Sequence, residues 1–148
     1  MADLSTRQLT IMTFDGVRLA VPLRDATTIE RTAQLQPEIT AGHAIGCILS
    51  RQQRYPVYAL SRRLEVLPAL PKQRLLCVCL GSDSSTPHLA IACDSVTALR
   101  LDSATAIQPL PACMQYTGTP LWGLCRVAQQ LVLVSSADAL ATYLLNRE

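Results

Sequence analysis

Several short runs along the chain have the hydrophobic pattern of β-strands, and the first two alternate hydrophobic and polar residues. Residues 8–14 (QLTIMTF) alternate, with Leu9 and Ile11 on one face, and residues 17–21 (VRLAV) alternate in the same way. Because Asp and Gly tolerate positive φ, Asp15-Gly16 predicts a tight hairpin turn between these two strands. Further runs with strand character cover residues 44–49, 55–60, 75–80, 89–93, 96–101, 121–127 and 131–134.

The segments between the early strands predict turns. Residues 22–31 lose the period of two, so a short helix or turn is predicted there, followed by a loop over residues 32–42. Residues 50–54 are predicted to be the turn that joins two strands. Pro56 lies inside the second of these strands and indicates an edge strand or a β-bulge, because proline cannot donate a hydrogen bond to a neighbouring strand.

The second half of the chain adds loops and one helix. Residues 61–65 predict one helical turn, residues 67–72 (LPALPK) a loop or subdomain boundary, and residues 81–87 a polar turn. At the C-terminus, Ser135 or Ser136 can cap a helix, and Ser135-x-x-Asp138 is similar to a capping box. The apolar stripe of this helix consists of Ala137, Leu140, Ala141, Leu144 and Leu145.

About nine short strands with few helices are typical of small barrels or a sandwich, and the pattern does not fit a doubly wound enzyme fold. The length of 148 residues suits one domain or two small fused subdomains. Hydrophobic residues make up 49% of the chain and aromatic residues only 4%, so the core is expected to be aliphatic.

Composition also bears on location and partners. No apolar run reaches the length of a membrane helix, and the N-terminal residues lack a signal-peptide pattern, so we expect a cytoplasmic protein without membrane insertion. A net charge of +2 is too small to imply a polyanionic partner. Twelve of the 13 basic residues are arginine, which suits specific pairing with carboxylates but is also a product of GC-rich genomes.

The six cysteines are expected to be free thiols in the core rather than a functional centre. Cys77-Val78-Cys79 places two thiols on one face of a strand, and His43 and His88 lie near no cysteine pair in the sequence. A redox sensor and a metal site remain lesser alternatives, and no metal or cofactor is predicted.

No motif for catalysis is present, so no catalytic residue is assigned. G-x-S-x-G, the phosphate-binding loop and G-x-G-x-x-G are all absent. A thiol-based sensor or hydrolase that pairs a cysteine with a histidine remains an alternative. A cluster of arginines and tyrosines is compatible with single-stranded nucleic acid, a solvated face or a protein-binding face: Arg51, Arg54, Tyr55, Tyr58, Arg62 and Arg63.

One segment connects the chain with a known family. Residues 46–60 (GCILSRQQRYPVYAL) resemble the pattern G-x-x-N-L-R-G-x-x-x-P-x-x-D-L of the CheW family, the coupling proteins of bacterial chemosensory arrays. Gly46, Arg51, Pro56 and Leu60 match without a gap. Weaker similarity extends over residues 8–146, including Phe14-x-Gly16, residues 89–96, Pro109-x-Pro111, Trp122-Gly123 and residues 131–134.

The resemblance implies a mostly β domain over residues 1–148, built from two intertwined five-stranded SH3-like barrels that share one core, with a C-terminal helix. It further implies a non-catalytic adaptor that joins the tip of a methyl-accepting chemoreceptor to the regulatory domain of a CheA-type histidine kinase, in flagellar, pilus-based or other chemosensory-like signalling, without nucleic acid. The partner-binding residues it implies are Ala26, Thr28, Gly46, Arg51, Gln52, Pro56, Val57 and Tyr58.

This chain departs from the family pattern at contact positions more than at core positions. Residues 26–29 (ATTI) lack the acid of the family's V-x-E-I, and residues 49–52 (LSRQ) lack both the Asn and the second Gly of N-L-R-G. Ala59 replaces the usual Asp. Because the missing glycine would supply positive φ, Gln52 predicts a reshaped turn.

Overall fold

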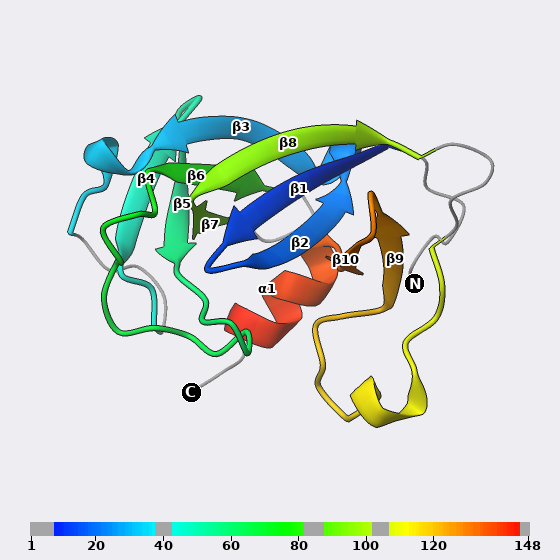
Figure 1. The fold of residues 1–148 in the computed structure, drawn as a ribbon. Helices are drawn as coiled ribbons and strands as arrows, with labels where there is room; N and C mark the ends of the chain where they lie inside the picture. Colours follow the sequence, from blue (N-terminus) through cyan, green and yellow to red (C-terminus); the bar gives the residue numbers. More distant parts are fainter. Residues whose placement is uncertain (1–7, 38–42, 82–87, 102–106, 146–148) are drawn as a thin grey trace.

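A computed structural model describes residues 8–37, 43–81, 88–101 and 107–145, which form two five-stranded sheets and one C-terminal α-helix (Figure 1). Residues 82–87 of the turn predicted at residues 81–87, and residues 38–42 of the loop predicted at residues 32–42, lie outside the described residues. The strands of the N-terminal half are β1 (Gln8–Phe14), β2 (Val17–Pro22), β3 (Ala26–Arg31), β4 (Gly46–Ser50) and β5 (Gln53–Tyr58). The C-terminal half contains β6 (Leu76–Leu80), β7 (Leu89–Cys93), β8 (Ser95–Arg100), β9 (Gly123–Val127), β10 (Gln130–Val134) and helix α1 (Ala137–Leu145).

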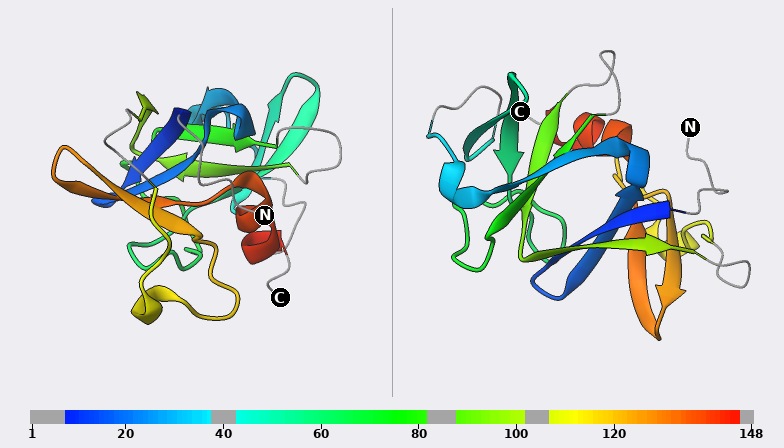
Figure 2. Two further views of the ribbon diagram at one scale, coloured as in Figure 1. Left: turned by 90° about the vertical axis from the view of Figure 1, so that its right-hand side faces the viewer. Right: turned by 90° about the horizontal axis from the view of Figure 1, so that it is seen from above.

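Each sheet takes strands from both halves of the chain. The sheet of the first barrel has the order β8-β1-β2-β10-β9, and that of the second barrel has the order β3-β6-β7-β5-β4. Both repeat one pairing pattern, in which one parallel contact, β2 with β10 or β7 with β5, interrupts a series of antiparallel ones. The barrels are therefore intertwined, and Figure 2 shows them side by side. This confirms the predicted fold class.

Strand alternation divides the apolar residues between three clusters. On β1, Leu9 and Ile11 face the interior of the first barrel, whereas Met12 and Phe14 face a core that both barrels share. On β6, Cys77 and Cys79 face the interior of the second barrel. A period of two lets one strand serve two cores, because successive side chains point to opposite faces. The shared core also receives α1, which lies beneath both sheets (Figure 1).

The prediction of a short helix or turn over residues 22–31 is wrong for most of this segment. Only Leu23–Asp25 forms a turn of 3₁₀ helix, and the residues after it form strand β3 rather than a helix or turn. A register shift between Ala26 and Thr28 interrupts the pairing with β6. The hydroxyl of Thr27, at this shift, donates a hydrogen bond to the Cys79 carbonyl at 3.1 Å. The bulge breaks the alternation by which a strand would be recognised in the sequence.

The prediction that Pro56 marks an edge strand is also wrong. Its strand, β5, is an interior strand that lies between β7 and β4. The pairing of β5 with β7 begins at Val57, one residue after the proline. Pro56 thus precedes the segment that pairs with β7, where its missing N–H would interrupt the sheet.

Helix α1 begins with two caps instead of the predicted capping box. The hydroxyl of Ser136 accepts a hydrogen bond from the Ala139 N–H at 3.1 Å. The buried carboxylate of Asp25, 112 residues away in sequence, accepts one from the Ala137 N–H at 2.9 Å. Ser135 instead donates its hydroxyl to the Pro120 carbonyl. The apolar stripe is confirmed, with Leu140 and Leu144 buried in the shared core.

Candidate partner-binding site

The β4–β5 hairpin presents Arg51 and Gln52 to solvent at its tip. Ser50 pairs with Gln53, so the turn has two residues and not the five predicted. Both turn residues have positive φ, 51° at Arg51 and 65° at Gln52, as a type I′ hairpin turn requires. Gln52 thus adopts the backbone conformation that glycine favours, and this turn keeps the tight form without glycine.

A hydrogen-bonded group of β3 and β4 side chains holds the base of this turn. The Ser50 hydroxyl donates to the Glu30 carboxylate at 2.6 Å and lies 2.9 Å from the Thr28 hydroxyl. Because β3 and β4 are the two edges of the same sheet, these bonds close the second barrel beside Arg51. The sequence pointed to Thr28 but missed Glu30, which restores a carboxylate two positions further along the same face of β3.

The other residues predicted for the site form its framework. Val57 and Tyr58 are fully buried, and Pro56 is buried beside them. Only glycine fits at position 46 without a steric clash, because a Cβ there would collide with the carbonyl oxygen of Gln36. The backbone of Gln36 pairs with β4. These four residues shape the hairpin from within, whereas Ala26 and Thr28 on β3 are half-buried.

Burial of the tyrosines removes the stacking surface that a nucleic-acid site would need. Tyr58 lies in the shared core, and Tyr55, which is 4% exposed, packs its ring against His88 at a centroid distance of 5.3 Å. Bases stack on exposed aromatic faces. Neither of these two tyrosines therefore offers an exposed ring beside the turn on which a base could stack.

Two apolar side chains flank the hydrogen-bonded group. Ile29, beside Thr28 on β3, is 52% exposed, and Leu49, beside Ser50 on β4, is 55% exposed. Each is large enough to anchor a contact with another protein, and each lies on an edge strand. We call Ile29, Leu49, Arg51 and Gln52 the hairpin surface.

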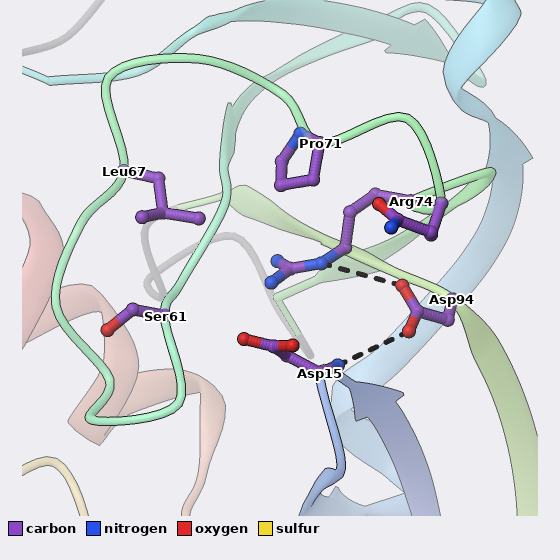
Figure 3. A pocket seen from close by; sticks show the side chains of 7 residues that line it. Asp15, Ser61, Leu67, Pro71, Arg74 and Asp94 are labelled. Carbon is purple, nitrogen blue, oxygen red and sulfur yellow. Dashed lines mark hydrogen bonds and ion pairs between the residues drawn. The ribbon is translucent and has the colours of Figure 1, made fainter.

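A second polar region lies where the barrels meet and has a cavity of about 310 Å³ (Figure 3). Arg74, 3% exposed, donates to the Leu60 carbonyl at 2.7 Å, lies 3.5 Å from the Asp94 carboxylate and stacks over the Phe14 ring at 4.8 Å. Asp94 also accepts the Asp15 N–H at 3.2 Å. Burial lowers the pKa of Arg74, and Asp94 and then Asp15 oppose this effect.

The polar side chains that line this cavity hold neighbouring segments of the chain together. Its hydroxyl, that of Ser61, accepts the N–H groups of Arg63 and Glu65 and so caps a turn. Neither histidine lines it. Arg74 contacts the Phe14 ring on β1 of the first barrel and donates to the Ala92 carbonyl on β7 of the second barrel, so it connects strands of both barrels.

The cysteines have the environment of core residues. All six are free, and only Cys113 is exposed. Burial raises the pKa of Cys77 and of Cys93 to about 12, and raises that of Cys79 to about 11 against a lowering by the hydrogen bond with Thr28. Since the thiolate is the reactive form, these buried thiols are poor nucleophiles at neutral pH.

Within the described ranges, no three His, Cys, Asp or Glu side chains come together as a metal site would need. No helix in that part of the chain is both long and apolar enough to span a membrane.

These features define a fold class of two intertwined five-stranded barrels with a shared core and one C-terminal helix. The same fold is seen in the crystal structure of the scaffolding protein TtCheW from Thermoanaerobacter tengcongensis, with a TM-score of 0.69 over 97% of this chain and 96% of that chain. The two sequences are 12% identical, so the likeness shows the fold alone. No protein-family model and no curated protein matches the sequence.

Proposed function

We propose that this protein is a non-catalytic adaptor of a bacterial chemosensory complex, which couples the tip of a methyl-accepting chemoreceptor to the regulatory domain of a CheA-type histidine kinase. The main support is the exposed Arg51 turn on a two-barrel fold like that of a CheW scaffolding protein. The whole chain acts as one domain, because its barrels share a core. The role implies a cytoplasmic location and needs no cofactor.

The hairpin surface indicates the chemistry of the partner. Arg51 offers a planar set of donors that suits a carboxylate. Leu49 and Ile29 offer apolar contacts on either side of the hydrogen bond between the Ser50 and Thr28 hydroxyls. A partner surface with an acidic residue beside an apolar pocket fits this arrangement. We assign this surface to the receptor contact, and the kinase contact to the adjoining edge strands β3 and β4.

The first experiment measures binding of the purified chain to a CheA-type regulatory domain and to a receptor-tip helical hairpin by calorimetry. Arg51→Glu should weaken receptor binding by about tenfold or more, since reversing a contact charge costs more than about 1.4 kcal/mol. Arg126→Glu is the matched control, because Arg126 is also an exposed arginine near a hairpin tip, on β9 of the other barrel. Absence of wild-type binding at tens of micromolar, or equal losses in both variants, contradicts the proposal.

A stability measurement separates a contact role from a structural one. Arg51 is exposed, so Arg51→Glu should change the free energy of unfolding by less than about 0.5 kcal/mol. A large drop in melting temperature would instead assign Arg51 to the maintenance of the turn.

The proposal covers flagellar chemotaxis and pilus-based twitching motility, since both require the same coupling. Deletion of the gene followed by swimming and twitching assays distinguishes the two pathways, and complementation with the Arg51→Glu variant connects the phenotype with the hairpin surface. Full rescue by this variant would show that the surface is dispensable.

A further inference from the structure

Neither half of the chain can complete a barrel by itself. The N-terminal half, residues 8–60, supplies β1 and β2 to the first barrel and β3 to β5 to the second. The C-terminal half, residues 74–145, supplies the remaining strands and α1. Of the eight strand pairings, four join the two halves, namely β1 with β8, β2 with β10, β3 with β6 and β5 with β7.

Side-chain contacts also cross between the halves. Asp25 of the N-terminal half caps α1 of the C-terminal half, and Arg74 of the C-terminal half binds the Leu60 carbonyl and the Phe14 ring of the N-terminal half. The surface that is complementary to one half is therefore the other half of the same sequence. A second copy of the chain offers this surface equally well.

The link between the halves has an anchored part and an exposed part. Leu64 is buried and its carbonyl accepts the Tyr143 hydroxyl at 2.6 Å, while Leu67 donates its N–H to the Ala59 carbonyl at 2.8 Å. Residues 68–73 (PALPKQ) then pass over the cavity between the barrels and are exposed or half-buried (Figure 3). Two prolines stiffen this stretch, since each fixes its own φ.

We propose that the chain exchanges halves with a second copy of itself, with residues 68–73 as the hinge. In the resulting dimer, each two-barrel unit contains the N-terminal half of one chain and the C-terminal half of the other. All four strand pairings and both side-chain contacts are kept, and only the hinge changes conformation. This is domain swapping, in which an element is replaced by the identical element of another protomer.

Concentration during folding determines which form is made. The hinge holds the two halves of one chain at an effective concentration on the order of millimolar, so the monomer is favoured in dilute solution. Exchange requires all four pairings to open together, so a folded monomer does not convert to dimer. Dimer forms when chains fold at high concentration and then persists.

The dimer would present two copies of each surface from one particle, and hence a bivalent adaptor if the proposed function holds. The exchange itself rests on the sheet topology, so the two proposals fail independently. Failure of exchange leaves receptor binding by the monomer unaffected.

The test uses two full-length chains, both with Cys113→Ser, of which one carries Gln8→Cys and the other Arg100→Cys. Gln8 and Arg100 are exposed and lie directly opposite each other across β1 and β8. The mixture is unfolded, refolded at about 1 µM or near the millimolar effective concentration of the tethered halves, and oxidised. A disulfide between the two chains is expected only after concentrated refolding and only in the dimer fraction. A chain with Arg126→Cys in place of Arg100→Cys is the control, because Arg126 is not paired with β1.

Two hinge variants change the balance in opposite directions. In the monomer, the hinge must bring the two halves of one chain together. Deletion of residues 69–72 makes the hinge too short for this, so light scattering should show dimer as the main species. Insertion of a nine-residue Gly-Ser segment after Ala69 should abolish dimer. The proposal is overturned if the wild-type chain forms only monomer after concentrated refolding. It is also overturned if the chains of the dimer crosslink no better than the Arg126 control. Both outcomes can be measured even if the deletion variant does not fold.

Discussion

The cap that Asp25 provides for α1 connects two segments far apart in sequence, and its removal should destabilise the whole fold. Asp25 is 7% exposed, and its carboxylate accepts the Ala137 N–H at 2.9 Å. Helix α1 covers the shared core through Leu140 and Leu144, so its first turn is coupled to both barrels. The change Asp25→Ala leaves a buried N–H without its acceptor and removes a negative charge from a helix N-terminus.

Loss of an N-cap costs about 1–2 kcal/mol, and loss of the favourable charge at the helix N-terminus adds up to about 1 kcal/mol. We therefore expect Asp25→Ala to lower the free energy of unfolding by about 2 kcal/mol, which for a chain of this size is about 4–8 °C in Tm. Asp25→Asn keeps an acceptor oxygen without the charge and should lose about half as much.

Urea unfolding followed by far-UV circular dichroism measures these differences. Asp138→Ala is the matched control, because Asp138 is an exposed carboxylate in the first turn of the same helix. Its loss should cost about 0.5 kcal/mol or less. If Asp25→Ala costs no more than Asp138→Ala, the contact with Ala137 does not stabilise the helix and the reasoning is wrong.

Further outcomes follow from the same structure. Arg74→Ala should cost about 3 kcal/mol in thermal or urea unfolding, because it leaves buried carbonyls without a donor, whereas Arg74→Lys should retain part of the stability. Gln52→Gly and Gln129→Gly should each stabilise by about 0.5 kcal/mol, since both glutamines have φ of 65° in hairpin turns; unchanged urea midpoints would contradict this. Thiol labelling of the native protein at pH 8 should modify Cys113 alone, and all six cysteines after unfolding; rapid labelling of a second thiol would revive a thiol-based function. Because folding raises the pKa of Cys77 from about 9 to about 12, its contribution to stability should be complete below pH 9 and decline as the pH rises toward 12, as urea titrations across this range can show.

Local sequence signals identified most of the fold. Runs with strand character predicted nine of the ten strands among the described residues, and Asp15-Gly16 predicted the first hairpin turn, where φ is positive at both residues. Strand β3 was missed because a bulge at Thr27 and an exposed Ile29 break its alternation. The position of Pro56 was misjudged because the order of strands in a sheet depends on pairings that a local pattern does not contain.

The geometry of the candidate site could be predicted from the sequence only in part. Arg51 stands exposed at a hairpin tip, as the match with the family pattern implied, but Val57 and Tyr58 of the same match are buried. Glu30 was missed, since its link with Ser50 joins opposite edges of a barrel and has no signature in the sequence.

The sequence by itself determined all of the described strands except β3, together with their apolar faces, because a strand pattern is a property of neighbouring residues. Tertiary structure alone decided which half completes which barrel, that Arg74 and Asp25 join distant segments, and that a carboxylate stands beneath the Arg51 turn. The physical reason is that these features depend on contacts between segments tens of residues apart. Such contacts form only when the chain closes on itself, and the local pattern of hydrophobic and polar residues is compatible with several ways of closing it.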